Sequence, residues 1–198
     1  MAQPRVLADW VIPGEGALRD VLRIAAANLV LALCAQVAIP LPWTPVPITG
    51  QTFGVMLVAT LLGSRRAAIV VCLYLLEGAA GLPVLQPFGA PGLARFFGPT
   101  AGYLWASPFA AFLTGWLVER IVAPVEAGRD ARTLRLVAAL IPGELLLLAA
   151  GFFWYTMSTG LNWSAAFAGS VLPFLPLDLF KIALVVAAVR GVELARSN

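Results

Sequence analysis

Long apolar runs alternate with short polar segments along the whole chain. The first run, from Ile24 to Ser64, contains no charged side chain. Because about 20 apolar residues of helix cross the hydrocarbon core of a bilayer, this run alone is long enough for about two crossings. Dividing the chain at its polar segments predicts six helices, at about residues 18–41, 51–64, 67–86, 99–122, 134–159 and 165–190.

The composition favours a membrane protein over a soluble one. Of the 198 residues, 61% are hydrophobic and 12% are charged, whereas soluble domains contain about 25% charged residues. A soluble protein of this composition would have too few polar side chains to cover its surface. We therefore expect an all-α membrane protein that forms a single domain over residues 1–198.

The basic side chains predict the orientation of the helices. With residues 1–17 in the cytoplasm, all but two of the 13 lysine and arginine residues fall at cytoplasmic ends of the six helices, as the positive-inside rule requires. The two exceptions are Arg95, in an outer loop, and Lys181, inside the last helix. Residues 1–17 mix charges of both signs and lack the apolar core of a signal peptide. We expect a multi-pass protein of the cell membrane with both termini cytoplasmic.

Several kinds of chemistry are excluded by the residues that the sequence lacks. The chain has no histidine, and its one lysine, Lys181, follows Phe180, so it has neither an imidazole base nor a phosphate-binding P-loop. Cys34 and Cys72 lie in apolar runs without a Cys-x-x-Cys motif, which indicates no zinc or redox site. The basic residues are scattered, which argues against nucleic-acid binding. We expect no catalytic residue, no metal and no cofactor.

The ionisable residues at membrane depth are the candidates for a functional site, because such groups cost free energy there. Asp178 and Lys181 are three residues apart and so share one helix face. Glu77 lies near the predicted midplane, and Glu144, predicted deeper toward the cytoplasm, ranks below it. Arg95 lies in a glycine-rich outer loop. Each could also be purely structural: a self-satisfied ion pair, an acid bonded to a neighbouring helix, or a solvated loop charge.

The proline-rich stretch Ile39–Phe53, "IPLPWTPVPITGQTF", falls in the first outer loop. The helix after it has about 14 residues and a rise of roughly 21 Å, less than the bilayer core. Irregular backbone at membrane depth survives only inside protein or along a cavity. The stretch is therefore predicted to be a stiff lid over an outward-facing cavity, with Trp43 covering the ligand and Gln51 at its inner edge. The alternative is a rigid spacer between two helices.

Aromatic residues are expected to surround the charged ones. The expected aromatic contacts are Trp43, Phe53, Phe88 and Tyr103. Two cations and two acids among aromatic walls suit a small amphipathic anion: a carboxylate pairs with a cation, an N–H-rich head with an acid, and an apolar body with the rings.

Four segments together resemble the BioY family, the biotin-binding S components of energy-coupling factor (ECF) transporters. They are "IPLPWTPVPITGQTF", "LYLLEGAAGLPVL", "FFGPTAGYLW" and "LPFLPLDLFK". The resemblance implies six helices and a biotin site near the extracellular face, covered by the loops after the first and third helices. Asp178 and Lys181 match the family's D-x-x-K pair, Arg95 a basic loop residue, and Gln51 the Q-T position.

The resemblance also implies partners. A transmembrane coupling protein and two cytosolic ATPase subunits would supply the energy for transport, which agrees with the missing P-loop. S components dock through an Ala-x-x-x-Ala spacing on the first helix, which this chain lacks; Ala32 and Ala35 belong to the nearest strip of small residues.

Two other functions compete with biotin capture. The three acids Glu77, Glu144 and Asp178 could drive a stand-alone, proton-coupled transporter of small carboxylates, although no inverted repeat is visible. Paired carboxylates could also act in an intramembrane hydrolase, for which the sequence offers nothing beyond the acids themselves.

Overall fold

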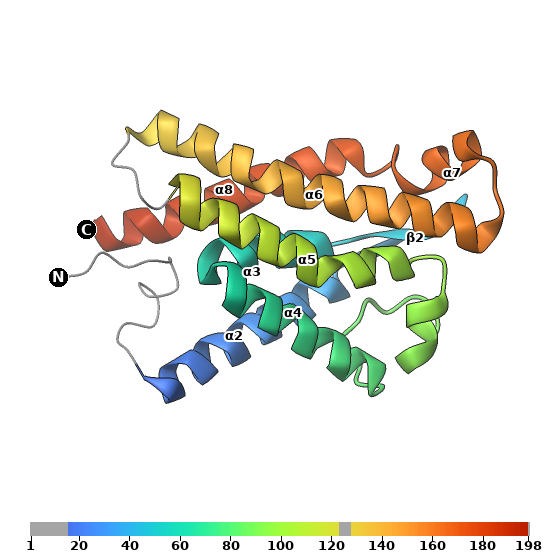
Figure 1. The fold of residues 1–198 in the computed structure, drawn as a ribbon, viewed down its shortest axis with the longest axis horizontal. Coiled ribbons are helices and arrows are strands. Elements are labelled where there is room, and N and C mark those ends of the chain that lie inside the picture. The colour runs from blue at the N-terminus through green and yellow to red at the C-terminus, as the bar shows by residue number, and fades with distance from the viewer. Residues whose placement is uncertain (1–15, 123–127, 198) are drawn as a thin grey trace.

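The computed structural model describes residues 16–122 and 128–197, and its helices run along one long axis (Figure 1). The predicted cytoplasmic segment 1–17 therefore lies almost wholly outside the described residues. The α-helices are α2 (Ala17–Gln36), α3 (Gln51–Leu62), α4 (Ser64–Ala79), α5 (Ala101–Leu117), α6 (Arg129–Thr159), α7 (Trp163–Ser170) and α8 (Leu175–Ser197). A 3₁₀ helix, η1 (Gly92–Phe97), precedes α5, and a π-helical turn, η2 (Val118–Val122), follows it.

The all-α expectation is wrong at the proline-rich stretch, which forms a hairpin of β1 (Ala38–Leu41) and β2 (Thr44–Thr49). The predicted helix 18–41 ends at Gln36 because Pro40 lacks an N–H group and disfavours helical backbone before it. The strands are antiparallel, with Ala38 opposite Thr49 and a bulge beside Pro40. A two-stranded sheet tolerates prolines because each strand has an outer edge that needs no donor.

The last predicted helix, 165–190, is also wrong as one continuous helix. The structure divides it into α7 and α8, joined by a turn over residues 171–174. Pro173 lies in that turn, and Pro176 lies in the first turn of α8, where a missing N–H costs no hydrogen bond. Helices α3 to α6 overlap the predicted ranges 51–64, 67–86, 99–122 and 134–159, with ends that differ by up to seven residues, the largest difference being the end of α4 at Ala79.

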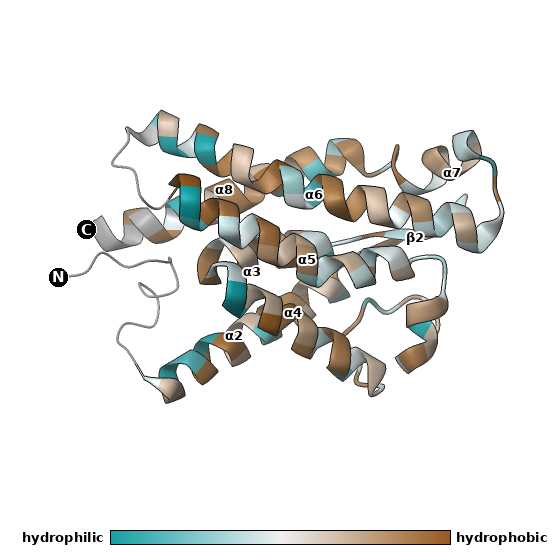
Figure 2. Ribbon diagram, in the orientation of Figure 1, coloured by the Kyte–Doolittle hydropathy of each residue, from teal (hydrophilic) through white to brown (hydrophobic). Residues whose placement is uncertain are grey.

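The outer surface of the helices is apolar. Among the described residues, two stretches have the length and hydropathy needed to cross a membrane: Asp130–Thr159 in α6, and Trp163–Val192, which includes α7, the turn after it and most of α8. Large apolar side chains such as Phe109, Phe153 and Leu179 are more than half exposed. Hydrophobic residues, drawn in brown, make up much of each helix (Figure 2). Such a surface suits lipid better than water.

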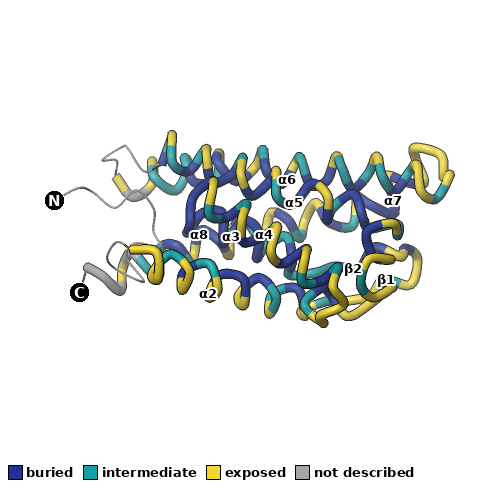
Figure 3. The backbone as a smooth tube through the Cα atoms, turned by 60° about the horizontal axis from the view of Figure 1, so that its bottom comes forward, coloured by how far each residue is buried: buried dark blue, intermediate teal, exposed yellow. Residues whose placement is uncertain are grey.

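Buried residues form a continuous core between the helices (Figure 3). Leu31, Met56, Val70, Leu140 and Val185, from five different helices, are at most 1% exposed. The core stabilises a bundle in which α5 contacts α3, α4 and α6, and it leaves one end of the bundle to the hairpin and loops.

Close backbone contact fixes α5 against the sharp turn between α3 and α4. A Cβ at Gly115 would lie 2.5 Å from the backbone of Gly63 and of Ser64. Glu119 of η2 secures the same turn, because its carboxylate accepts hydrogen bonds from Ser64 N at 2.8 Å and Ser64 Oγ at 2.9 Å. The start of α4 at Ser64 is thus held by the side chain of Glu119, in the π-helical turn that follows α5.

We predict that Gly115→Ala destabilises the protein by roughly 1–3 kcal/mol, because the added methyl group meets backbone that cannot rotate away. Gly191→Ala is the matched control: it also lies in a helix, and its Cβ would meet nothing within 4 Å. Thermal unfolding in detergent measures both. Equal melting temperatures for the two variants would contradict the close contact.

Candidate functional site

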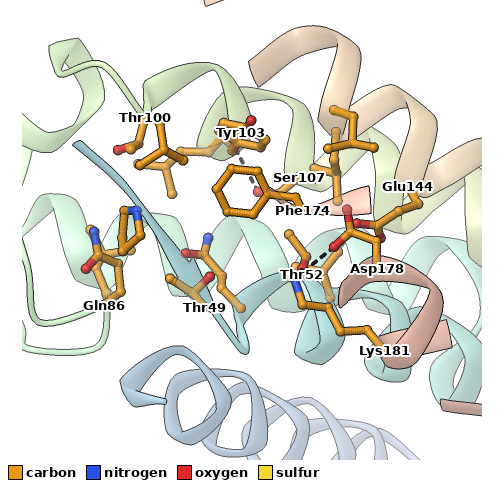
Figure 4. A pocket seen from close by; sticks show the side chains of 18 of the residues that line it. Thr49, Thr52, Gln86, Thr100, Tyr103, Ser107, Glu144, Phe174, Asp178 and Lys181 are labelled. Carbon is orange, nitrogen blue, oxygen red and sulfur yellow. Dashed lines mark hydrogen bonds and ion pairs between the residues drawn. The ribbon is translucent and has the colours of Figure 1, made fainter. Parts of the chain in front are cut away.

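A cavity lies between the hairpin and the helices and contains about 710 Å³ not filled by protein atoms, part of it open to solvent. Its lining comes from β2, α3, α5, α6, α8 and the loop between α4 and α5 (Figure 4). The polar lining residues are Thr49, Gln51, Thr52, Gln86, Arg95, Thr100, Tyr103, Ser107, Glu144, Asp178 and Lys181.

A buried ion pair lies on one wall of the cavity. Lys181 Nζ donates to Asp178 Oδ1 at 3.0 Å and to Thr52 Oγ1 at 2.7 Å. The side chains of Lys181 and Asp178 are only 11% and 7% exposed. The second oxygen, Asp178 Oδ2, has no hydrogen-bond partner among the residues that the structure describes. A buried acceptor without a donor costs free energy, so this oxygen would be stabilised by a further hydrogen-bond donor.

Glu144 lies beside the pair and was underrated from the sequence. It is 5% exposed and lines the cavity, and its carboxyl group points toward Asp178 (Figure 4). Gly143 brings α6 close to α5, because a Cβ there would lie 3.2 Å from Ala110 O. The sequence did contain a signal: Glu144 is the one charged residue between Arg135 and Asp178.

Arg95 organises the loop between α4 and α5. Its Nε donates to Ala90 O at 2.8 Å, its Nη2 to Gln86 O at 3.0 Å, and its Nη1 to Phe88 O. Burial lowers the pKa of the Arg95 guanidinium, which stays charged at neutral pH because arginine titrates far above it. These partners are neutral, so Arg95 brings a positive charge to the cavity without a bonded acid.

Aromatic and amide side chains complete the lining. Tyr103 Oη donates to Ser170 O, and the Tyr103 ring lies 6.4 Å from that of Phe174. Gln51 is the first residue of α3 and is 8% exposed. The structure therefore brings five of the predicted site residues to one cavity: Gln51, Arg95, Tyr103, Asp178 and Lys181.

Four predicted residues do not line the cavity. Trp43 forms part of the hairpin turn and is 66% exposed. Phe53 packs against the hydrophobic core, and Phe88 contributes its backbone carbonyl to Arg95 while its side chain is 41% exposed. Glu77 accepts a hydrogen bond from Asn28 Nδ2 at 3.2 Å, which links α4 to α2.

The predicted docking residues lie mostly inside the bundle. Ala35 is completely buried, and Ala32 is half-buried and packs against the same core. The structure therefore does not present Ala35 to a partner protein. The exposed face of α2 consists of larger residues, among them Leu29 and Leu33, each 60% exposed.

The hairpin covers part of the cavity and is tied to α7. Val46, Pro47 and Thr49 of β2 line the cavity. Thr44 Oγ1 donates to Gly169 O at 2.8 Å and accepts from Val46 N at 3.2 Å. One buried side chain thus holds the covering strand against the bundle.

We predict that Arg95→Lys loosens the loop over residues 86–97, because one ammonium group cannot reproduce the planar set of bonds to three carbonyls. Losing one or two of these bonds costs roughly 1–2 kcal/mol. Amide hydrogen exchange in that loop should then accelerate about tenfold or more, while exchange in α3 stays unchanged. Equal protection in the variant would show that Arg95 does not hold the loop.

Comparisons with known proteins identify the family. The BioY family matches residues 5–198. The chain is 43% identical to "Biotin transporter BioY" of Rhizobium etli over 86% of this chain and 89% of that protein. It is 34% identical to "Biotin transporter BioY2" of Lactococcus lactis over 88% of both.

A solved structure agrees with the sequence relatives. A crystal structure of the S-component for biotin from an ECF-type ABC transporter matches with a TM-score of 0.79 and 26% identity, over 91% of this chain and 95% of that one. The fold of this chain thus matches that of a solved S-component structure. The chain is a member of the BioY family.

Proposed function

We propose that this membrane protein captures biotin in the cavity and serves as the substrate-binding subunit of an ECF-type transporter. One observation carries the proposal: within a BioY-family chain, the matched D-x-x-K pair Asp178–Lys181 lies buried in the wall of a cavity, with one carboxylate oxygen that lacks a donor among the described residues. Biotin is the transported ligand rather than a cofactor, and no catalytic role is proposed.

The chemistry of the cavity fits the two ends of biotin. The urea ring of biotin offers N–H donors, which suit Asp178 Oδ2, an acceptor without a donor among the described residues. The ammonium of Lys181 is already balanced by Asp178, whereas Arg95 bonds only to carbonyls. We therefore place the urea at Asp178 and the carboxylate toward Arg95, with the apolar body against Tyr103 and Phe174.

The proposed role as an ECF substrate-binding subunit also implies a membrane topology and partner proteins. We propose six membrane crossings with both termini in the cytoplasm, which places the hairpin and the Arg95 loop on the outer side of the cell membrane. A coupling protein and two ATPase subunits are the proposed partners. Because Ala35 is buried, we propose that docking on α2 uses the exposed side chains of Leu29 and Leu33.

A stand-alone, proton-coupled carboxylate transporter is the second candidate, favoured by the two adjacent carboxyl groups of Glu144 and Asp178. Liposomes that contain this chain and no ATPase separate the two functions. Uptake that a protonophore abolishes supports the second candidate, whereas binding without uptake supports the first.

We predict that Asp178→Asn weakens biotin binding at least about 30-fold, because breaking a buried charged hydrogen bond costs roughly 2–5 kcal/mol. Lys181→Met should weaken it as well, since it leaves Asp178 buried without a counter-ion. Isothermal titration calorimetry on the purified protein measures both, and Asp130→Asn, an exposed acid on α6, is the control. Folded wild-type protein that binds no biotin would refute the proposed function.

We predict that Thr44→Val speeds biotin release about 2- to 10-fold, because the isosteric change removes the hydroxyl that ties β2 to α7. Trp43→Ala should leave release unchanged, since the indole lies outside the cavity. Stopped-flow displacement of labelled biotin measures both rates. Faster release in Trp43→Ala would show that the hairpin tip folds over the ligand, as the sequence suggested.

A further inference from the structure

Two carboxyl groups share one cation in the wall of the cavity. Glu144 on α6 and Asp178 on α8 are each 5% exposed, and the Glu144 carboxyl group points toward Asp178 in the wall of the cavity (Figure 4). Figure 4 shows both beside Lys181. Of these three residues, the sequence analysis placed only Asp178 and Lys181 in the biotin site, and the proposed biotin capture above uses only those two.

The groups that face Glu144 come from three helices. Asp178 and Lys181 lie on α8 and Tyr103 on α5, and Thr52 on α3 contributes an uncharged hydroxyl. Arg95, the other cation of the lining, is held by its loop carbonyls. In the described part of the chain, Lys181 is therefore the single cation that faces both carboxyl groups.

The hydrogen bonds of the ion pair leave one carboxylate oxygen of Asp178 without a donor among the described residues. Lys181 occupies Asp178 Oδ1, and Asp178 Oδ2 has no donor. If Glu144 were ionised, two buried acceptors of like charge would face each other, which is costly in an apolar environment. A proton on Glu144 removes the repulsion and supplies the donor that Asp178 Oδ2 lacks.

We propose, resting on the proposed function, that Glu144 is a specificity residue that holds one proton against Asp178 and that biotin binds only while this proton is present. When the ligand enters, a urea N–H replaces Glu144 as the donor to Asp178 Oδ2. The Glu144 hydroxyl then turns to donate to the urea carbonyl oxygen. No covalent bond forms or breaks, and the proton stays on Glu144.

This arrangement selects the chemistry of the ligand head. The protonated pair presents one acceptor and one donor side by side, which matches a group with an adjacent N–H and C=O, as in a cyclic urea or amide. Loss of the proton turns the donor into a second buried negative charge that faces the urea oxygen. Affinity must then fall about tenfold for each pH unit above the titration of Glu144, since one proton is linked to binding.

The test measures biotin affinity by calorimetry between about pH 5 and about pH 9 for wild type, Glu144→Gln and Asp130→Asn. The proposal expects the wild type and Asp130→Asn to lose affinity with rising pH, and Glu144→Gln, which keeps a neutral donor, to bind at every pH like the wild type at low pH. A flat wild-type profile overturns the proposal. So does a fall in Glu144→Gln equal to the wild-type fall, which would assign the titration to a group other than Glu144.

Infrared spectroscopy on the ligand-free protein gives an independent readout. The proposal expects the C=O stretch of a protonated carboxyl group in the wild type at neutral pH and its loss in Glu144→Gln. Identical spectra overturn the proposal whatever the binding data show. Because this measurement needs no biotin, a failure of the proposed function, seen as absent biotin binding, is distinguished from a failure of the proton assignment.

Discussion

The ion pair between Lys181 and Asp178 is the interaction on which the site depends. Charges at this depth in an apolar bundle are costly unless they are paired and hydrogen-bonded, and the bond from Lys181 to Thr52 fastens α8 to α3 at 2.7 Å. The pair still leaves one carboxylate oxygen without a donor. A purely structural pair would gain by satisfying that oxygen, so its lack of a donor supports the proposal that a ligand completes the network.

Two non-helical segments close the cavity, and each is anchored to a helix. Gln36, at the end of α2, donates to the carbonyls of Pro83, Val84 and Leu85 at 3.1–3.2 Å. Thr44 performs the equivalent role for the hairpin through Gly169. Irregular backbone near a membrane must have its polar groups satisfied by protein, and these side chains provide that while leaving the segments dependent on few bonds.

Sequence reasoning located the helices and the ion pair because both depend on local spacing: apolar run length, and two charges three residues apart on one face. It missed the hairpin, since a proline-rich stretch does not reveal that its two halves pair. It could not place the Trp43 side chain, which is 66% exposed in this structure, because a position in a loop does not say which way the turn presents the side chain. Glu144 was underrated because its place beside Asp178 depends on how α6 packs against α5 at Gly143, which only the assembled bundle determines.

The biotin-bound structure of this protein tests the central claim most directly. The account predicts ligand density in the cavity, with a urea nitrogen within hydrogen-bond distance of Asp178 Oδ2 and the carboxylate toward Arg95. Density elsewhere, or biotin in the cavity with Asp178 Oδ2 still lacking a contact to it, would contradict the account.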